Sequence, residues 1–204
     1  MIERKRTLIE IASAQNGYFT AKQAKDAGYT DSTHPYHIKN GDWTREWRGI
    51  YRISDYPYTD SRPELTLWQL WSRDRNEKVQ GVFSHETALD IYDLSDNIPA
   101  KLHITVPKSF KKGSAIPPTI ELNYEDLDVG DINVKNGIRI TTPLKTIVDI
   151  IARQNLTEDL IKQALLQSIE RGLILRSEVR NPTITGPEWA KRQLQALLNT
   201  GKVA

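Results

Sequence analysis

The chain has 204 residues, 38% of them hydrophobic, which is enough for one large domain or two small ones with an apolar core. Its 28 basic and 26 acidic residues leave a net charge of +2, so total charge alone indicates neither a nucleic-acid, a membrane nor an acidic partner. The absence of cysteine excludes disulfides, thiolate metal sites and cysteine nucleophiles. The first residues of the chain are charged, and no apolar segment approaches the roughly 20 residues that a membrane span needs. We therefore expect a cytoplasmic protein with no membrane partner.

The N-terminal region begins with the signals of two short helices. Apolar residues recur at helical spacing over 4–14, and this segment ends at Gly17. Thr20 stands where its hydroxyl can cap a second helix over 21–27, which Gly28 ends.

A third helix is expected within residues 32–40, directly after a glycine-containing turn. Two short helices joined in this way are typical of helix-turn-helix modules, whose second helix enters the major groove. Pro35 fits only the first turn of a helix, so the helix is expected to begin at His34 or Pro35, which leaves the register of its contacts open. Its polar side chains, which can reach base edges or phosphates, are Ser32, Thr33, His34, Tyr36, His37 and Lys39.

The next segment predicts a β-hairpin, the wing of a winged helix-turn-helix. Two runs rich in aromatic and β-branched residues, 42–47 and 50–53, flank Arg48-Gly49. The glycine can supply the positive φ that a tight turn needs. Arg45 and Arg48 lie near or at the tip, where a guanidinium can reach phosphates or the minor groove.

The predicted DNA-binding site combines the third helix, the hairpin and the start of the second helix. Residues 1–56 hold nine Lys/Arg against seven Asp/Glu, and this small excess of two means that the fold must sort the basic residues onto one face. The full set is Thr20, Lys22, Ser32, Thr33, His34, Tyr36, His37, Lys39, Arg45 and Arg48.

Simpler interpretations of these residues stay open. A helix-turn-helix also serves as a packing or protein-interaction module. Tyr36 suits a core as well as a DNA contact, whereas Trp43 and Trp47 suit a core better. His34 and His37 are three residues apart, but no carboxylate or cysteine accompanies them, so no metal site is predicted.

Residues 54–63 contain two prolines and several turn formers, which predicts a linker between domains at 1–56 and 64–204. Periodicity in the second domain predicts helices over 64–75 and 84–92, strands over 101–107, 119–123 and 137–141, and helices over 142–152, 157–172 and 186–199. Ser84 is expected to cap the second of these helices. This order predicts an α+β fold class, with a small antiparallel sheet and C-terminal helices following the winged helix-turn-helix.

The order of these motifs resembles the AbiEi family of antitoxins. In the N-terminal part the likeness is carried by Gly17-Tyr18-Phe19-Thr20, Asn40-Gly41-Asp42-Trp43 and, above all, Trp47-Arg48-Gly49-Ile50-Tyr51-Arg52-Ile53. Beyond the linker it is carried by Gly81-Val82-Phe83-Ser84-His85-Glu86-Thr87-Ala88-Leu89, by Val106-Pro107, and by Ile140-Thr141-Thr142-Pro143-Leu144-Lys145-Thr146-Ile147-Val148-Asp149. The resemblance covers most of the chain, although Pro35 departs from the recognition helix that it leads us to expect.

The resemblance implies a phage-defence role in a type IV toxin-antitoxin system. The N-terminal domain would then repress its own operon by binding inverted repeats in double-stranded DNA, with a dimer on the DNA as one option. The C-terminal domain would counteract a nucleotidyltransferase-like toxin without forming a stable complex with it.

An enzyme, above all a nuclease with a winged-helix head, is the main alternative. A metal-dependent nuclease needs two or three carboxylates and commonly a lysine around a divalent cation. Because residues 124–131 are dense in acids and lack long apolar flanks, we expect a solvated acidic loop instead. Neighbours such as Ser84, His85 and Glu86 are not expected to form a catalytic chain, so no catalytic residue, metal or cofactor is predicted. The nuclease candidates are Glu121, Glu125, Asp126, Asp128, Asp131 and Lys135.

A third interpretation concerns the helices from Thr142 onward, whose apolar stripes suit an internal core or a surface for a second protein. We expect a core. Basic residues of the last helix also offer a second nucleic-acid contact, through Lys191, Arg192 and Lys202. The stripes consist of Leu160, Ile161, Ala164, Leu165, Ile169, Leu194, Leu197 and Leu198.

Overall fold

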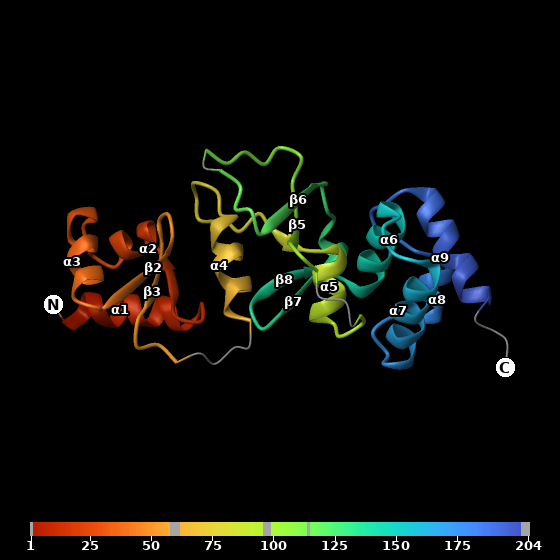
Figure 1. The fold of residues 1–204 in the computed structure, drawn as a ribbon, viewed down its shortest axis with the longest axis horizontal. Coiled ribbons are helices and arrows are strands. Elements are labelled where there is room, and N and C mark those ends of the chain that lie inside the picture. The colour runs from red at the N-terminus through yellow and green to blue at the C-terminus, as the bar shows by residue number, and fades with distance from the viewer. Residues whose placement is uncertain (1, 58–61, 96–98, 114, 201–204) are drawn as a thin grey trace. The chain divides into compact units, whose positions relative to one another are not determined.

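The computed structural model describes residues 2–57, 62–95, 99–113 and 115–200 (Figure 1). The chain divides into two compact units, Met1–Gln80 and Gly81–Ala204. Both contain helices and a sheet, and the predicted α+β class is confirmed. In the part of the chain described, no helix has the length and apolar character that a bilayer-spanning segment needs.

The division between the units falls later than the predicted linker at 54–63, part of which lies outside the described residues. The reason is that the segment after the linker packs on the N-terminal elements. Trp68 meets Trp47 edge to face with ring centroids 5.2 Å apart. The Thr66 hydroxyl accepts a hydrogen bond from the side-chain Nδ2 of Asn16 at 2.8 Å. Residues 63–80 therefore belong to the first unit.

Unit 1 is built from short helices around a three-stranded antiparallel sheet, with strand order β1-β3-β2. The third helix begins at His34 and places Pro35 in its first turn, as its sequence predicts. The elements are α1 (Ile2–Ser13), β1 (Tyr18–Thr20), α2 (Ala21–Asp26), the 3-10 helix η1 (Asp31–Thr33), α3 (His34–Lys39), β2 (Trp43–Trp47), β3 (Ile50–Ile53) and α4 (Pro63–Trp71).

Local sequence signals explain the main turns of unit 1. The Thr20 hydroxyl accepts from the Gln23 amide at 3.1 Å and the Gln23 side chain accepts from the Thr20 amide at 2.8 Å, which forms a capping box at the start of α2. Gly49 adopts a φ of +73° between β2 and β3. The predicted cap and hairpin are both confirmed.

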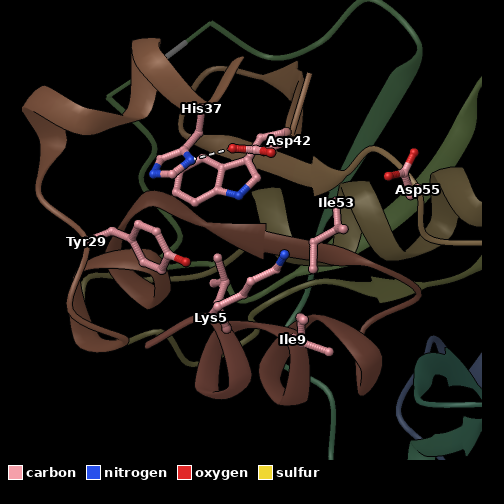
Figure 2. Close-up of a pocket in the computed structure, with 9 residues that line it drawn as sticks. Lys5, Ile9, Tyr29, His37, Asp42, Ile53 and Asp55 are labelled. Atoms are coloured by element: carbon pink, nitrogen blue, oxygen red, sulfur yellow. Dashed lines mark hydrogen bonds and ion pairs between the residues drawn. The ribbon is translucent and has the colours of Figure 1, made fainter. Parts of the chain in front are cut away.

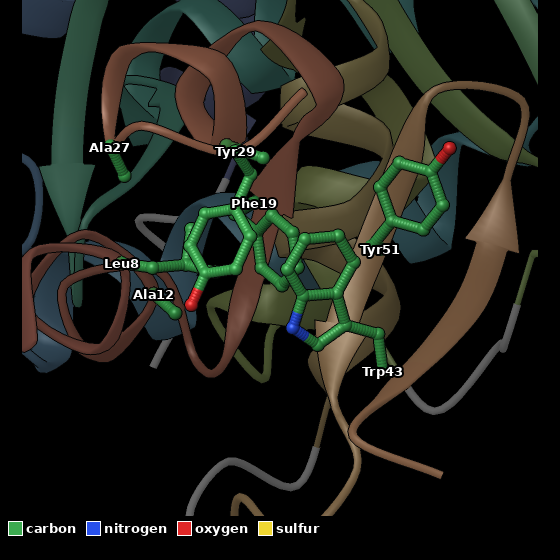
Figure 3. Close-up of a cluster of buried hydrophobic side chains, with 8 residues drawn as sticks. Leu8, Ala12, Phe19, Ala27, Tyr29, Trp43 and Tyr51 are labelled. Atoms are coloured by element: carbon green, nitrogen blue, oxygen red, sulfur yellow. The ribbon is translucent and has the colours of Figure 1, made fainter. Parts of the chain in front are cut away.

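An aromatic cluster forms the core of unit 1 (Figure 3). Phe19 is fully buried and meets Trp43 edge to face, with ring centroids 4.9 Å apart. Leu8 and Ala12 of α1 pack against these rings from the helix side, as Figure 3 shows. The expectation that Trp43 belongs to a core is confirmed by an exposed fraction of 5%.

Replacing Gly17 with alanine is expected to destabilise unit 1 by about 2 kcal/mol or more. Gly17 has a φ of +84°, and a Cβ there would lie 2.6 Å from the Tyr56 ring. The free energy of unfolding in urea measures the effect. Gly41→Ala is the matched control, because Gly41 has a φ of +79° but a Cβ added to it would meet no described atom within 4 Å. Equal losses in the two variants would contradict the Tyr56 contact.

Unit 2 joins a five-stranded sheet to a group of C-terminal helices (Figure 1). The strand order is β6-β5-β4-β8-β7. The elements are β4 (Val82–Phe83), α5 (His85–Ile91), β5 (Leu102–Val106), β6 (Ile120–Tyr124), the 3-10 helix η2 (Val129–Asp131), β7 (Ile132–Lys135), β8 (Ile138–Thr141), α6 (Pro143–Arg153), α7 (Glu158–Glu170), α8 (Arg176–Arg180) and α9 (Glu188–Thr200).

The predicted antiparallel sheet is wrong, because this sheet is mixed. Strands β5 and β6 are parallel, as are β4 and β8, whereas β4 with β5 and β7 with β8 are antiparallel. A parallel pair needs a connection of about a dozen residues or more, and the long segment 107–119 supplies one between β5 and β6. Among the described strands of unit 2, a tight hairpin joins only β7 and β8, and the antiparallel neighbours β4 and β5 are separated in the chain by α5.

The C-terminal helices bury most of their apolar stripes within unit 2. Ile147 and Val148 of α6 are fully buried, and α6 packs against both α7 and α9. Leu165 and Leu194 are also fully buried, whereas Leu160 remains 44% exposed. The stripes therefore form internal core for the most part, as expected.

Candidate nucleic-acid interface

Helix α3 turns one of its predicted contact residues inward. His34 is 4% exposed and packs edge to face on Trp43 and Tyr51, at centroid distances of 5.3 and 5.4 Å. Its burial lowers the pKa of the imidazole, which keeps the ring neutral in this aromatic setting. The prediction that His34 contacts DNA is therefore wrong, because the ring is a core residue.

The opposite side of α3 faces solvent. Tyr36 is 61% exposed, which removes the interpretation that it belongs to a core. Lys39 and Ser32 are also exposed, whereas Thr33 is half-buried and its hydroxyl donates to the Thr30 carbonyl at 2.8 Å. This face offers hydroxyl, phenol and ammonium groups, which are the groups that reach base edges and phosphates.

His37 lies between these two faces and lines a cavity of about 140 Å³ (Figure 2). Its Nδ1 atom lies 2.8 Å from Oδ2 of Asp42, and its ring stacks on Trp43 at 4.6 Å. Figure 2 shows Tyr29 and Lys5 on the other walls of the cavity. His37 therefore fixes the C-terminal end of α3 against β2, and only part of its side chain faces solvent.

Thr20 is a second residue of the predicted DNA contact set that is buried. It is 8% exposed, and its hydroxyl both caps α2 and donates to Oε2 of Glu77 at 2.9 Å. This burial and these two interactions argue against the predicted contact of Thr20 with DNA. Sequence alone identifies the cap but not the carboxylate, which comes from 57 residues further along the chain.

The hairpin and the start of α2 meet at one place. The Ala21 amide, in the first turn of α2, donates to the Gly49 carbonyl at 2.9 Å. Arg48 at the hairpin tip and Lys22 on α2 are exposed, and so is Arg45 on β2. The residues that remain accessible from the predicted site are Lys22, Ser32, Thr33, Tyr36, His37, Lys39, Arg45 and Arg48.

Unit 2 contains a separate buried ionic cluster that sequence reasoning missed. The Lys145 side chain is fully buried, lies 2.7 Å from Oε2 of Glu125 and pairs with Asp149. Burial lowers the pKa of Lys145, but the attraction of the two carboxylates outweighs this effect and the net shift is upward. The spacing of Lys145 and Asp149, four residues apart on one helix, is the signal that could have revealed the pair.

Ser84 and His85 form a hydrogen bond that their sequence does not predict. Oγ of Ser84 lies 2.9 Å from Nδ1 of His85 and accepts from the Thr105 hydroxyl at 2.8 Å. The two residues are not helical neighbours, because Ser84 is extended and His85 has a φ of +51°. Ser84 stands at the cap position of α5 but makes no capping bond, so that prediction is wrong.

The Ser84–His85 hydrogen bond is not part of a catalytic triad among the described residues. The Glu86 carboxylate pairs with another histidine, because its Oε2 lies 3.4 Å from Nε2 of His103. Burial lowers the pKa of His85 to about 3, and the nearby His103, Arg153 and Lys145 act in the same direction. Ser84 is itself fully buried.

The solvated acidic loop predicted at 124–131 is found in part, because most of its residues are exposed whereas Glu125 and Asp131 make internal contacts. Glu121 lies on β6 and pairs with Arg153, and Glu125 pairs with Lys145. Asp131 is 1% exposed and accepts from the Thr185 amide at 3.1 Å, while Asp126 and Asp128 are exposed. Lys135 Nζ donates to the Ile91 carbonyl at 3.0 Å. Within the described residues, no three metal-ligating side chains come close enough to hold an ion.

The basic residues of the last helix offer less than their sequence suggests. Lys191 is half-buried and pairs with Glu188 at 2.9 Å, whereas Arg192 is exposed. Lys202 lies outside the described residues. Among these three residues, Arg192 is thus the one that the structure places at the surface without such a pairing.

The sequence matches no protein-family model and no curated protein. Among solved structures, the chain is similar to the crystal structure of the RV2827C protein from Mycobacterium tuberculosis, with a TM-score of 0.53 and 12% sequence identity. The likeness covers 99% of this chain and 78% of that chain. At this identity the likeness concerns the fold alone.

Proposed function

We propose that unit 1 is a winged helix-turn-helix that binds double-stranded DNA. Helix α1, strand β1, helices α2 and α3 and the β2–β3 hairpin follow one another in the order that such a module requires. In this assignment α3 is the recognition helix and the hairpin is the wing.

The observation that carries this proposal is the sorting of side chains on α3. His34 faces the aromatic core, whereas Tyr36 and Lys39 of the same short helix face solvent. Helix α3 thus has one face that anchors it and one face free to enter a groove. Arg45 and Arg48 on the hairpin add cations for the phosphate backbone.

We infer further that the whole chain acts in the cytoplasm as a repressor of its own operon and as a type IV antitoxin. The support for this part is the sequence resemblance to AbiEi antitoxins, which extends through unit 2 in motifs such as 140–149. The expected operator is a pair of inverted repeats, and the expected counterpart is a nucleotidyltransferase-like toxin that is counteracted without a stable complex.

The combined variant Lys39→Ala, Arg45→Ala and Arg48→Ala is expected to weaken binding to the DNA upstream of the gene by at least about tenfold at about 0.1 M salt. Removing three cations from the proposed groove and phosphate contacts causes this loss. Fluorescence anisotropy of the full chain with this DNA and with a scrambled duplex measures the effect. Arg6→Ala is the control, because Arg6 is exposed on α1 and already pairs with Glu10 at 3.0 Å.

Selective binding by the natural chain that falls in the combined variant, but not in the control, would support the repressor function. Equal and weak binding to both duplexes would contradict it. The same combined variant, produced together with the toxin of its operon, is expected to protect growth as the natural chain does, because unit 2 is unchanged. Loss of protection would contradict the separation of the two roles.

The nuclease alternative makes an opposite prediction with the same protein. A nuclease would cleave the labelled duplex in the presence of Mg²⁺, and Glu121→Gln together with Glu125→Gln would abolish the cleavage. We expect intact DNA throughout.

A further inference from the structure

We propose that the turn at Arg73–Val79 is a second phosphate-contacting element of the DNA interface, with Arg75 and Lys78 as its contact residues. This inference rests on the proposed function of unit 1. The turn follows α4 and lies outside the segment that sequence analysis assigned to DNA binding.

The turn has a fixed shape. Its ends pair through a bridge between Arg73 and Val79, and the Asp74 amide donates to the Lys78 carbonyl at 3.0 Å. Oδ1 of Asp74 accepts from the Asn76 amide at 2.8 Å and from the Lys78 amide at 3.0 Å. A carboxylate that holds two backbone amides in this way organises a tight turn.

The turn is docked on the start of α2. Oε2 of Glu77 accepts from the Thr20 hydroxyl at 2.9 Å and lies 3.3 Å from the Arg73 guanidinium. Nζ of Lys22 donates to the Arg75 carbonyl at 3.0 Å. The backbone of the turn is thus held beside a residue of the predicted DNA-binding site.

These contacts use the acidic side chains of the turn and leave the side chains of Arg75 and Lys78 exposed. Asp74 binds backbone amides and Glu77 binds Thr20 and Arg73. Arg75 and Lys78 are exposed, and within the part of the chain described their side chains form no ion pair or hydrogen bond. The turn therefore presents two exposed cations that are not ion-paired among the described residues, although the Asp74 carboxylate, which holds the Asn76 and Lys78 amides, lies in the same turn.

The cations of the turn continue a basic band toward α3. The hydrogen bond from the Ala21 amide to the Gly49 carbonyl brings the hairpin tip, with Arg48, to the same end of α2. Lys22 and Lys25 are one helical turn apart, and Lys25 pairs at 3.1 Å with Asp31 at the start of η1. A phosphate backbone that follows the start of α2 toward α3 would pass this band.

The double variant Arg75→Ala, Lys78→Ala tests the inference in the full chain. If each side chain neutralises one phosphate, the slope of log affinity against log salt is expected to fall by about 1.8, or about 0.9 for each contact. Affinity is expected to fall by at least about tenfold at about 0.1 M salt. The loss should be the same for the upstream DNA and for a scrambled duplex, because phosphate contacts carry no sequence information. Arg6→Ala is again the control, and circular dichroism checks that the variant remains folded.

The outcomes separate this inference from the proposed function. If the natural chain binds its upstream DNA selectively and the double variant keeps its affinity and salt slope, the turn is not a contact element while the repressor function stands. If the natural chain does not distinguish the duplexes but the double variant weakens both, the turn contacts DNA and the repressor function is wrong. Absence of any binding overturns both.

Discussion

Lys145→Met is expected to destabilise unit 2 by about 3–5 kcal/mol, the largest effect of any single substitution that we predict. The Lys145 side chain is fully buried, and the Asp149 side chain is 6% exposed. Methionine keeps most of the volume and removes the ammonium. Asp149 would then be buried without its cation, and Glu125 would lose a partner at 2.7 Å.

Urea unfolding followed by hydrogen exchange of α6 peptides measures this loss within unit 2. A second variant, Lys145→Met with Asp149→Leu, is expected to recover most of the stability, because it removes the uncompensated carboxylate together with the ammonium. Lys101→Met is the matched control at an exposed lysine and should change the free energy of unfolding by less than about 0.5 kcal/mol. A small loss in Lys145→Met itself would show that the ion pair does not stabilise the fold.

Short-range signals allow the elements around the interface to be predicted. The cap at Thr20, the start of α3 at His34 and the turn at Gly49 each depend on one or two residues and their immediate neighbours. These effects act within a turn of helix or hairpin, so the sequence contains all the information needed. The β7–β8 hairpin was missed, although Asn136-Gly137 is a strong signal for a tight turn.

Burial and long-range pairing could not be predicted in the same way. A helix as short as α3 has too few residues for periodicity to decide which side faces inward, so the sequence predicts one contact surface for both His34 and Tyr36. The Thr20 hydroxyl is hydrogen-bonded to Glu77, and no local sequence pattern connects these two residues. The parallel pairing of β5 and β6 likewise depends on the path of the long segment between them.

The Lys145–Asp149 pair shows why a motif can be noticed and its chemistry still be missed. Residues 140–149 carry part of the family resemblance, but a lysine on an amphipathic helix ordinarily faces water. Here the cation is fully buried, and it is paired at 2.7 Å with Glu125, which directly follows β6. The proposed DNA interface and the stabilising ion cluster therefore belong to different units, and substitutions in them should affect different measurements.

The stability of unit 2 is expected to fall as the pH is lowered, with His85 as a main cause. Burial lowers the pKa of His85 to about 3, from an ordinary value of 6.5 in the unfolded chain. Between these values the unfolded chain binds a proton that the folded chain does not, so stability is present above pH 6.5 and is lost toward pH 3. The contribution is about 1.4 kcal/mol per pH unit, or about 2 kcal/mol between about pH 6.5 and pH 5.

The groups around His85 determine how this effect must be measured. Burial also lowers the pKa of His103, which acts in the same direction, whereas burial raises the pKa of Asp149, which acts in the opposite direction. Comparison with His85→Asn cancels both contributions, because asparagine does not titrate and tolerates the φ of +51° at this position.

At about pH 8 the natural chain and His85→Asn differ only through packing and hydrogen bonding, since the imidazole is neutral in both the folded and the unfolded chain. The free energy of unfolding of unit 2, measured again at about pH 5, should fall by about 2 kcal/mol more in the natural chain than in the variant. Equal losses in the two proteins would mean that His85 accepts a proton in the folded state. The ring would then lie in a more solvated site than its bond to Ser84 and its 9% exposure indicate.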